Sequence, residues 1–166
     1  MRKLLIIILS AILLAACNSA GCLDNGSTLP LAGFYSSTSG QAVSIDSLQI
    51  QGLGAPGDSL LLKPSRGVKQ VYMPLRAGVP STTWVFSYKQ GHLDNPAFND
   101  TLVFTYETIP YFASEDCGAM YIYRVEGLTH TTHLIDSILL TDSLFTNVEA
   151  ERIKIYFRTA QEEPAQ

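Results

Sequence analysis

The sequence predicts an all-β fold, an antiparallel β-sandwich of about eight strands with an Ig-like or similar arrangement. Three observations predict it. Short segments have apolar residues that alternate with polar ones or form brief runs, turn-forming residues separate these segments roughly every 10 to 15 residues, and no stretch has the apolar period of an amphipathic helix. Strands this short must bury one face against a second sheet, so two packed sheets are expected, with a barrel as the alternative.

The expected strands follow one another at residues 43–51, 59–62, 68–75, 84–88, 101–108, 120–126, 133–141 and 152–158. Pro56-Gly57 is a turn signal before the second strand, and Gln90-Gly91 closes the fourth. Pro74 favours an edge position or a strand end for the third, because proline cannot donate to a sheet ladder.

The last expected strand has the clearest pattern, a strict period of two. Ile153, Ile155 and Phe157 alternate with Lys154, Tyr156 and Arg158. Residues two apart on a strand share a face, so the first three are expected in the core. The same reasoning places Leu102, Phe104 and Tyr106 on one face of their strand. It also places Tyr121, Tyr123 and Val125 on one face of the next strand, with the residues between them on the other face.

The N-terminus predicts an export signal at residues 1–16. Arg2 and Lys3 precede an apolar run at residues 4–14, which is too short to span a bilayer. Cleavage before Cys17 would take both cations away and move the formal net charge from −4 to −6. An acidic chain without a basic cluster excludes nucleic acid as the expected partner. Residues 17–40 are expected to be a tether, partly ordered near Cys22 and around residues 31–35, before a β domain at 41–158 and a disordered tail at 159–166.

Leu14-Ala15-Ala16-Cys17 resembles the lipobox of bacterial lipoproteins, in which the cysteine becomes the lipid-modified N-terminus. The resemblance implies that Cys17 carries acyl chains and that these hold the protein to a membrane. Asn18 follows the cysteine, so the aspartate that marks inner-membrane retention is missing, and so is an acidic run that marks surface export. The expected location is therefore the outer membrane, with the domain facing the periplasm.

Two further cysteines remain, Cys22 and Cys117, in a compartment where disulfides persist. An even remainder predicts one bridge between them. A free structural thiol is an alternative. A catalytic Cys117 with His130 or His133 as base is disfavoured, because Glu115 and Asp116 beside it would hinder formation of the thiolate.

A triad of Asp, Ser or Thr, and Leu or Ile occurs five times. Its central hydroxyl residues are Ser47, Ser59, Thr101, Ser137 and Ser143. Turn capping by Asp and Ser explains the triads without any further function. The triad also resembles the acceptor site of the general O-glycosylation system of Bacteroides-type bacteria, which implies glycan attachment at one or more of these hydroxyls.

No catalytic residue, metal site or cofactor is expected. Gly57-Asp58-Ser59-Leu60 matches the nucleophile block of the Gly-Asp-Ser-Leu esterases, but the chain lacks their Asp-x-x-His element and their α/β alternation. His130 and His133 have no third ligand at useful spacing for zinc. The oxygen-bearing side chains at residues 94–100 lack the EF-hand pattern.

Aromatic residues crowd both sides of Cys117, at Tyr106, Tyr111, Phe112, Tyr121 and Tyr123. If these side chains pack inward, they form part of the hydrophobic core. If they lie on an exposed face, they can bind a sugar or a peptide by stacking. Tyr111 and Phe112 are the residues expected to form such a ligand patch.

With the lipobox, Cys22, the Asp100-Thr101-Leu102 strand and Cys117-Gly118 before an aromatic strand, the chain resembles a family of exported lipoproteins of unknown function from Bacteroides-type bacteria. The resemblance supports the anchor, the β fold and the paired cysteines. The expected function is a non-enzymatic periplasmic module that binds an envelope protein or glycan. A structural accessory subunit of an outer-membrane complex is the alternative, and a hydrolase is less favoured.

Overall fold

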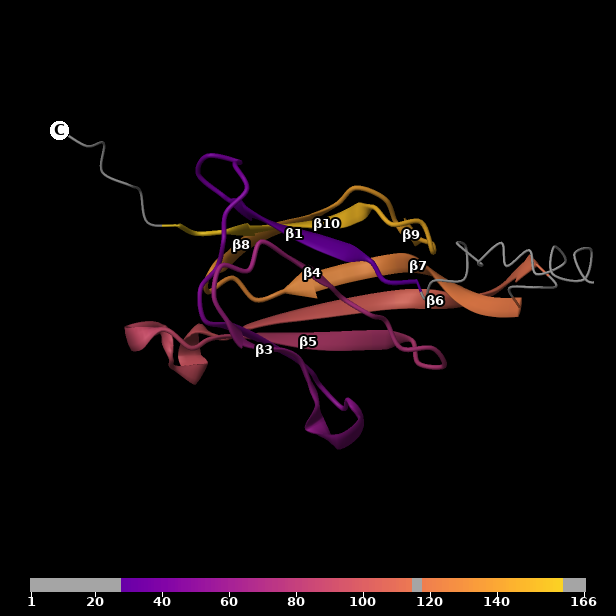
Figure 1. Ribbon diagram of the computed structural model, residues 1–166, viewed down its shortest axis with the longest axis horizontal. Helices are drawn as coiled ribbons and strands as arrows, with labels where there is room; N and C mark the ends of the chain where they lie inside the picture. Colours follow the sequence, from indigo (N-terminus) through magenta and orange to yellow (C-terminus); the bar gives the residue numbers. More distant parts are fainter. Residues whose placement is uncertain (1–27, 115–117, 160–166) are drawn as a thin grey trace, which may run out of the picture.

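The computed structural model describes residues 28–114 and 118–159, which form a two-layered β-sandwich (Figure 1). The all-β prediction is therefore confirmed. The strands of the described part are β1 (Leu31–Ser36), β2 (Leu48–Gly52), β3 (Leu60–Ser65), β4 (Gln70–Tyr72), β5 (Ser81–Tyr88), β6 (Asp100–Ser114), β7 (Gly118–His130), β8 (Ile135–Leu140), β9 (Leu144–Phe145) and β10 (Glu151–Phe157). Three short 3-10 turns accompany them, at Pro56–Asp58, Gly91–Leu93 and Pro96–Phe98.

The strands form a four-stranded sheet in the order β4-β1-β10-β8 and a six-stranded sheet in the order β3-β2-β5-β6-β7-β9. The strand pairs are antiparallel except β1 and β10, which run parallel. The expectation of a purely antiparallel sandwich is corrected at this pair. Because β1 and β10 are connected by the rest of the domain rather than by a hairpin, no short turn forces them to run in opposite directions.

The core lies between the sheets, where alternate residues of each strand point inward. On β5 these are Thr82, Trp84, Phe86 and Tyr88, and on β10 they are Ile153, Ile155 and Phe157. Phe34 of β1 meets Phe157 edge to face, with 5.2 Å between ring centroids. The period of two read from the last strand is thus confirmed, and aromatic rings fill much of the space between the layers.

The folded domain begins before the expected boundary at residue 41, because β1 lies inside the segment expected to be a tether. Ala32 and Phe34 are fully buried, and Gly33 between them is buried as well. A Cβ on Gly33 would lie 2.0 Å from Oε2 of Glu151, so the glycine leaves room for that carboxylate. The order expected around residues 31–35 is this strand, and the boundary moves accordingly.

Each of the eight expected segments contains a strand, but their lengths differ from the prediction. Within residues 43–51, only the part from Leu48 onward belongs to a strand, β2. Before it, Ala42 and Ile45 each make a single isolated bridge, to Tyr35 and Val68. Residues 68–75 shorten to the three residues of β4. β9 was not expected, since two residues cannot show a period.

The β6–β7 hairpin is much longer than expected, and Figure 1 shows it extending beyond the end of the facing sheet. Its inner face is therefore covered near Val125 and uncovered nearer the turn, where Tyr121 is 49% exposed. A change of register between Thr105 and Tyr106 of β6 falls opposite Gly127 of β7. A Cβ on Gly127 would lie 2.5 Å from Oγ1 of Thr105, so this close approach needs glycine.

Several predictions concern residues outside the described ranges. These are the signal at 1–16, the anchor Cys17, the pair Cys22 and Cys117, and residues 160–166 of the tail. Within the described ranges, no helix is both long and apolar enough to cross a membrane.

Candidate functional site

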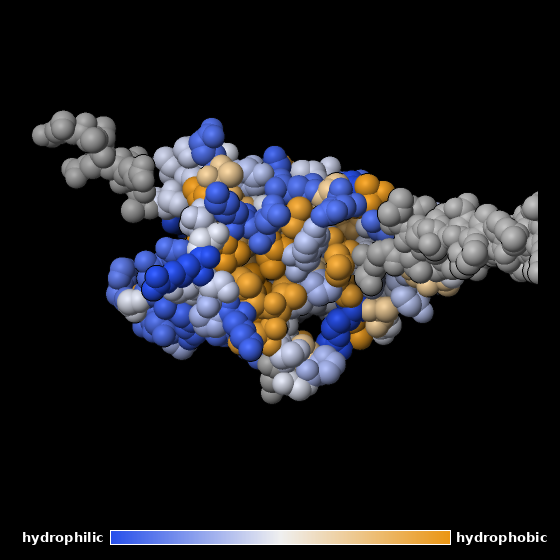
Figure 2. Space-filling model, viewed as in Figure 1, coloured by the Kyte–Doolittle hydropathy of each residue, from blue (hydrophilic) through white to orange (hydrophobic). Residues whose placement is uncertain are grey.

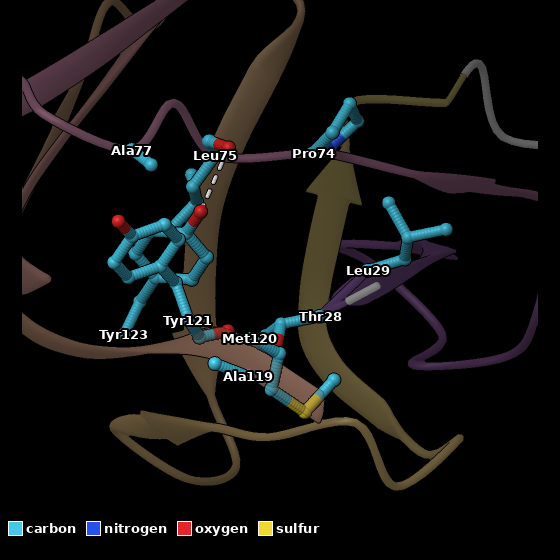
Figure 3. A pocket seen from close by; sticks show the side chains of 9 residues that line it. All are labelled: Thr28, Leu29, Pro74, Leu75, Ala77, Ala119, Met120, Tyr121 and Tyr123. Carbon is cyan, nitrogen blue, oxygen red and sulfur yellow. Dashed lines mark hydrogen bonds between the residues drawn. The ribbon is translucent and has the colours of Figure 1, made fainter. Parts of the chain in front are cut away.

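A pocket of about 470 Å³ opens at the end of the sandwich where the β6–β7 hairpin overhangs (Figure 3). We call it the aromatic pocket. Its wall on the hairpin side comes from β7, and the opposite wall comes from the segment after β4 and from the residues before β1. Its lining includes Thr28, Leu29, Pro74, Leu75, Tyr121 and Tyr123. Its volume falls in the range of small-ligand sites, about 300–1,000 Å³.

The alternation of β7 builds the aromatic wall. Tyr121, Tyr123 and Val125 share the inner face, and the other sheet covers Val125 and Tyr123 but leaves Tyr121 half exposed. Figure 3 shows the rings of Tyr121 and Tyr123 side by side on one wall. The pocket thus presents one accessible ring backed by a buried one.

Tyr123 is held in place by two contacts. Its hydroxyl donates to the carbonyl oxygen of Leu75 at 3.2 Å, and its ring meets Tyr106 edge to face at 5.3 Å between centroids. Burial raises the pKa of the Tyr123 hydroxyl above its usual value, and the neighbouring Tyr106 and Tyr121 add to the effect. The hydroxyl therefore stays protonated and keeps donating throughout the neutral range.

The opposite wall is fixed to the six-stranded sheet. The backbone N–H of Arg76 donates to the Tyr106 hydroxyl at 3.1 Å, and that hydroxyl donates to the Arg76 carbonyl oxygen at 2.8 Å. On the N-terminal side, the Thr28 hydroxyl donates to the carbonyl oxygen of Tyr121 at 2.6 Å. Both walls are held by specific hydrogen bonds, so the pocket is preformed, which lowers the entropy cost of binding.

The structure separates the two residues expected to form the ligand patch. Tyr111 and Phe112 are 44% and 64% exposed, but as neighbours on β6 they point to opposite faces. Phe112 lies opposite Ala119, on the face of the aromatic pocket but nearer the hairpin turn. Neither residue lines the pocket. Tyr121, which the sequence grouped with the same aromatic cluster, supplies the exposed ring instead.

Asp100 is the centre of a buried hydrogen-bond network, and its carboxylate is fully buried. It accepts five hydrogen bonds. The donors are the backbone N–H groups of His133 and Leu134 at 2.8 Å, that of Ile135 at 2.9 Å, and the hydroxyls of Thr131 and Tyr88 at 2.9 Å. The carboxylate thus fastens the start of β6 to the turn between β7 and β8. This role could not be predicted from the sequence, because the donors are mostly backbone groups more than thirty residues away.

The five triads differ in accessibility. Ser59, Ser137 and Ser143 are exposed, whereas Ser47 and Thr101 are half-buried. The aspartate before Thr101 is Asp100, which is fully buried, so a glycosyltransferase could not contact it in the folded protein. Ser47 lies in a turn with a φ of 53°. Access therefore favours three of the five hydroxyls as modification sites.

Neither His130 and His133 nor the oxygen-bearing side chains at residues 94–100 form a metal site in the part of the chain that the structure describes. No three His, Cys, Asp or Glu side chains of that part come together. His133 Nδ1 lies 2.9 Å from the Asn99 carbonyl oxygen, and His130 Nε2 lies 3.5 Å from that of Asp136. Asp94 pairs with Lys89 at 2.7 Å, and the Asn95 side chain caps the following turn. Turn and cap contacts thus account for these residues.

Residues 47–157 match a family of unknown function, DUF6452. No curated protein and no solved structure shows significant similarity to the chain. The match covers most of the described domain, from the residue before β2 to the end of β10.

Proposed function

Because this chain belongs to that family of unknown function, we propose a role from the geometry: it is a non-enzymatic binding module of the cell envelope that takes a glycan in the aromatic pocket. The observation that carries the proposal is the half-exposed ring of Tyr121 on a preformed wall. Sugars stack on such rings and hydrogen-bond to the hydroxyls and carbonyls beside them. The polar groups of the described lining are tyrosine and threonine hydroxyls and backbone groups, a set that supports recognition better than catalysis.

The proposed anchor places this pocket close to a membrane. The signal and lipobox pattern supports a lipid on Cys17, an outer-membrane location and a periplasmic domain, as in the Bacteroides-type lipoproteins that the chain resembles. Thr28 lines the pocket and stands eleven residues after Cys17. A fully extended chain of that length spans at most about 40 Å, so the pocket would lie within that distance of the lipid surface.

The proposed bridge between Cys22 and Cys117 would fasten the same end of the domain. The hydrogen bond from Thr28 to Tyr121 fixes one point where the two segments meet. Cys22 is six residues before Thr28, and Cys117 is four residues before Tyr121. At about 3.3 Å per residue, either segment is long enough for the two cysteines to meet. The bridge would close the tether onto the hairpin beside the aromatic pocket.

The test of the proposed function is a binding titration with a matched pair of variants. The probes are soluble fragments of peptidoglycan and of the lipopolysaccharide core, titrated by calorimetry into residues 17–166 carrying Cys17→Ser. Tyr121→Ala removes the accessible ring of the pocket and should weaken binding by about 10- to 100-fold, the usual effect of losing one buried aromatic contact.

Tyr111→Ala is the control, because Tyr111 is similarly exposed but lies on the other face of the same hairpin. It should bind as the unaltered chain does. Equal losses in the two variants, or no binding of any envelope glycan, would remove the proposal.

A protein partner is the second candidate, in the form of an accessory subunit docked at the hairpin. The specific observation is the exposure of Phe112, which projects from the overhanging end of β6. A photo-crosslinking residue at position 112, introduced in native membranes, should then give one discrete protein adduct. The same label at exposed Leu139 on β8 is the control. Adducts of equal yield and pattern at both positions would count against this assembly role.

A further inference from the structure

A second pocket opens along the other edge of the sandwich, between β3 and the segment that follows β4. It holds about 310 Å³. We call it the leucine pocket, and its lining includes Leu53, Leu60, Leu61, Leu75, Arg76 and Trp84. Figure 2 shows apolar residues gathered on this face between the levels of β4 and β3, where the surface is hollowed.

The leucine pocket exists because the facing edges of the two sheets differ in length. β4 has three residues and β3 has six, so the four-stranded sheet cannot cover the whole of β3. Leu60 and Leu61 therefore remain half-buried, and Leu53 at the rim is 52% exposed. An uncovered apolar hollow of this kind gains free energy when an apolar group fills it.

The charged group at this pocket is Arg76, and the other polar side chains of its described lining are the hydroxyls of Ser59 and Thr82. Arg76 lies at the mouth, where its Nη1 would be 3.4 Å from a Cβ built on Gly54. The Tyr106 hydroxyl holds the backbone of Arg76 on both its N–H and its carbonyl group, which fixes the place from which the guanidinium projects. No acidic side chain that the structure describes lines the pocket. The hollow is thus apolar in its body and cationic at its mouth.

Trp84 forms part of the wall of the leucine pocket. The residue is 6% exposed, and its six-membered ring lies against Gly52, where a Cβ would be 3.0 Å from Cζ3 of the indole. The indole ring therefore adds a further apolar surface to this hollow.

We propose that the leucine pocket binds the anion of a medium-chain fatty acid, with its aliphatic tail among the leucines and its carboxylate at Arg76. The volume corresponds to roughly ten water-sized groups, which suits a tail of about eight to ten carbons. This site is distinct from the aromatic pocket, although Leu75 lies in the wall between the two. The proposal does not depend on the glycan proposal, and either can fail alone.

The single tryptophan of the chain allows a direct test, because Trp84 lines this pocket and does not line the aromatic pocket. Residues 17–166 with Cys17→Ser are titrated with hexanoate, octanoate and decanoate. Affinity should rise about 15-fold for each pair of methylenes until the pocket is full. Decanoate should shift the emission of Trp84 at sub-millimolar concentration, while an unchanged emission spectrum up to the solubility limit overturns the proposal.

Two variants and one analogue test the assigned contacts, and a third variant is the control. Arg76→Gln and the methyl ester of decanoate each remove one partner of the ion pair and should each weaken binding about two- to five-fold, as expected for a partly exposed pair. Arg66→Gln removes an exposed arginine outside the pocket and should change nothing. Ala55→Phe fills the pocket and should abolish the emission shift. Binding that survives Ala55→Phe, or affinities that do not vary with chain length, would contradict the assignment.

The occupant itself is tested by comparing two forms of the protein. If the lipidated protein already shows the shifted emission and no longer responds to decanoate, the occupant is the acyl group on its own Cys17, and the proposal of a free fatty acid is overturned. If the lipidated protein and the Cys17→Ser form respond alike, the free fatty acid is supported.

Discussion

Replacement of Asp100 by asparagine tests the clearest structural assignment in the domain. The carboxylate is fully buried and accepts five hydrogen bonds, three of them from consecutive backbone N–H groups at residues 133–135. An asparagine amide keeps one acceptor oxygen and turns an NH₂ group toward these donors, so at least two of them lose their partner. The variant should retain the fold while the turn between β7 and β8 loses its fastening.

The magnitude follows from the hydrogen bonds lost and the charge removed. A hydrogen bond to a charged group contributes about 1.5–3 kcal/mol, and the neutral amide recovers part of the cost of burying a charge. We therefore expect Asp100→Asn to lower the free energy of unfolding by about 3–5 kcal/mol. This is a large share of the 5–15 kcal/mol that is typical of a domain.

Urea denaturation followed by the fluorescence of Trp84 measures the loss. Asp94→Asn is the matched control, because Asp94 forms an exposed ion pair with Lys89 that should be worth less than about 1 kcal/mol. Hydrogen exchange of the amides at residues 133–135 should also accelerate in Asp100→Asn. A loss of stability below about 1 kcal/mol, with unchanged exchange at these amides, would refute the reasoning.

Four further predictions follow from other contacts. Burial and the charge of Asp100 raise the pKa of Tyr88. The protonated hydroxyl therefore contributes its full stabilisation below about pH 10, and this contribution is lost as the pH rises above the unfolded pKa near 10. In alkaline denaturation, the free energy of unfolding of Tyr88→Phe should fall less steeply with pH than that of the unaltered chain, by up to about 1.4 kcal/mol per pH unit. Gly33→Ala should push Glu151 away from the Tyr35 hydroxyl, and spectrophotometric titration should find the raised pKa of Tyr35 nearer to 10. Cys22→Ser should lower the unfolding free energy by up to about 4.7 kcal/mol, with no further loss on adding reductant, whereas reductant sensitivity in the variant would exclude the bridge to Cys117. Glycopeptide mapping of the native protein should find glycans, if any, at Ser59, Ser137 or Ser143, and a glycan on Thr101 would contradict the accessibility argument.

The sequence predicted the fold class because the signal was local. The alternation in β10 and in the first half of β6 needs only neighbouring residues to be read, and both strands lie where it placed them. β1 was harder, since Gly33 interrupts its run of apolar residues and Glu151, the side chain that lies over this glycine, is more than a hundred residues away. The parallel pairing of β1 with β10 likewise has no local signal.

The candidate site was less predictable than the fold. Aromatic residues near Cys117 pointed to the hairpin that forms one wall of the aromatic pocket, but sequence alone could not show how far the facing sheet extends over it. That extent decides that Tyr123 is buried and Tyr121 is accessible, although both lie on the same face. The leucine pocket depends in the same way on β4 being shorter than β3, and the role of Asp100 depends on distant backbone donors.

The proposed binding role is tested most directly by mapping NMR chemical shifts during titration with soluble peptidoglycan and lipopolysaccharide-core fragments. We expect a fragment that binds to perturb the signals of Thr28, Leu75, Tyr121 and Tyr123 together, and Tyr121→Ala to need about 10- to 100-fold more fragment for the same changes at Thr28, Leu75 and Tyr123. Perturbations confined to another surface, or none at millimolar concentrations of every fragment, would contradict it.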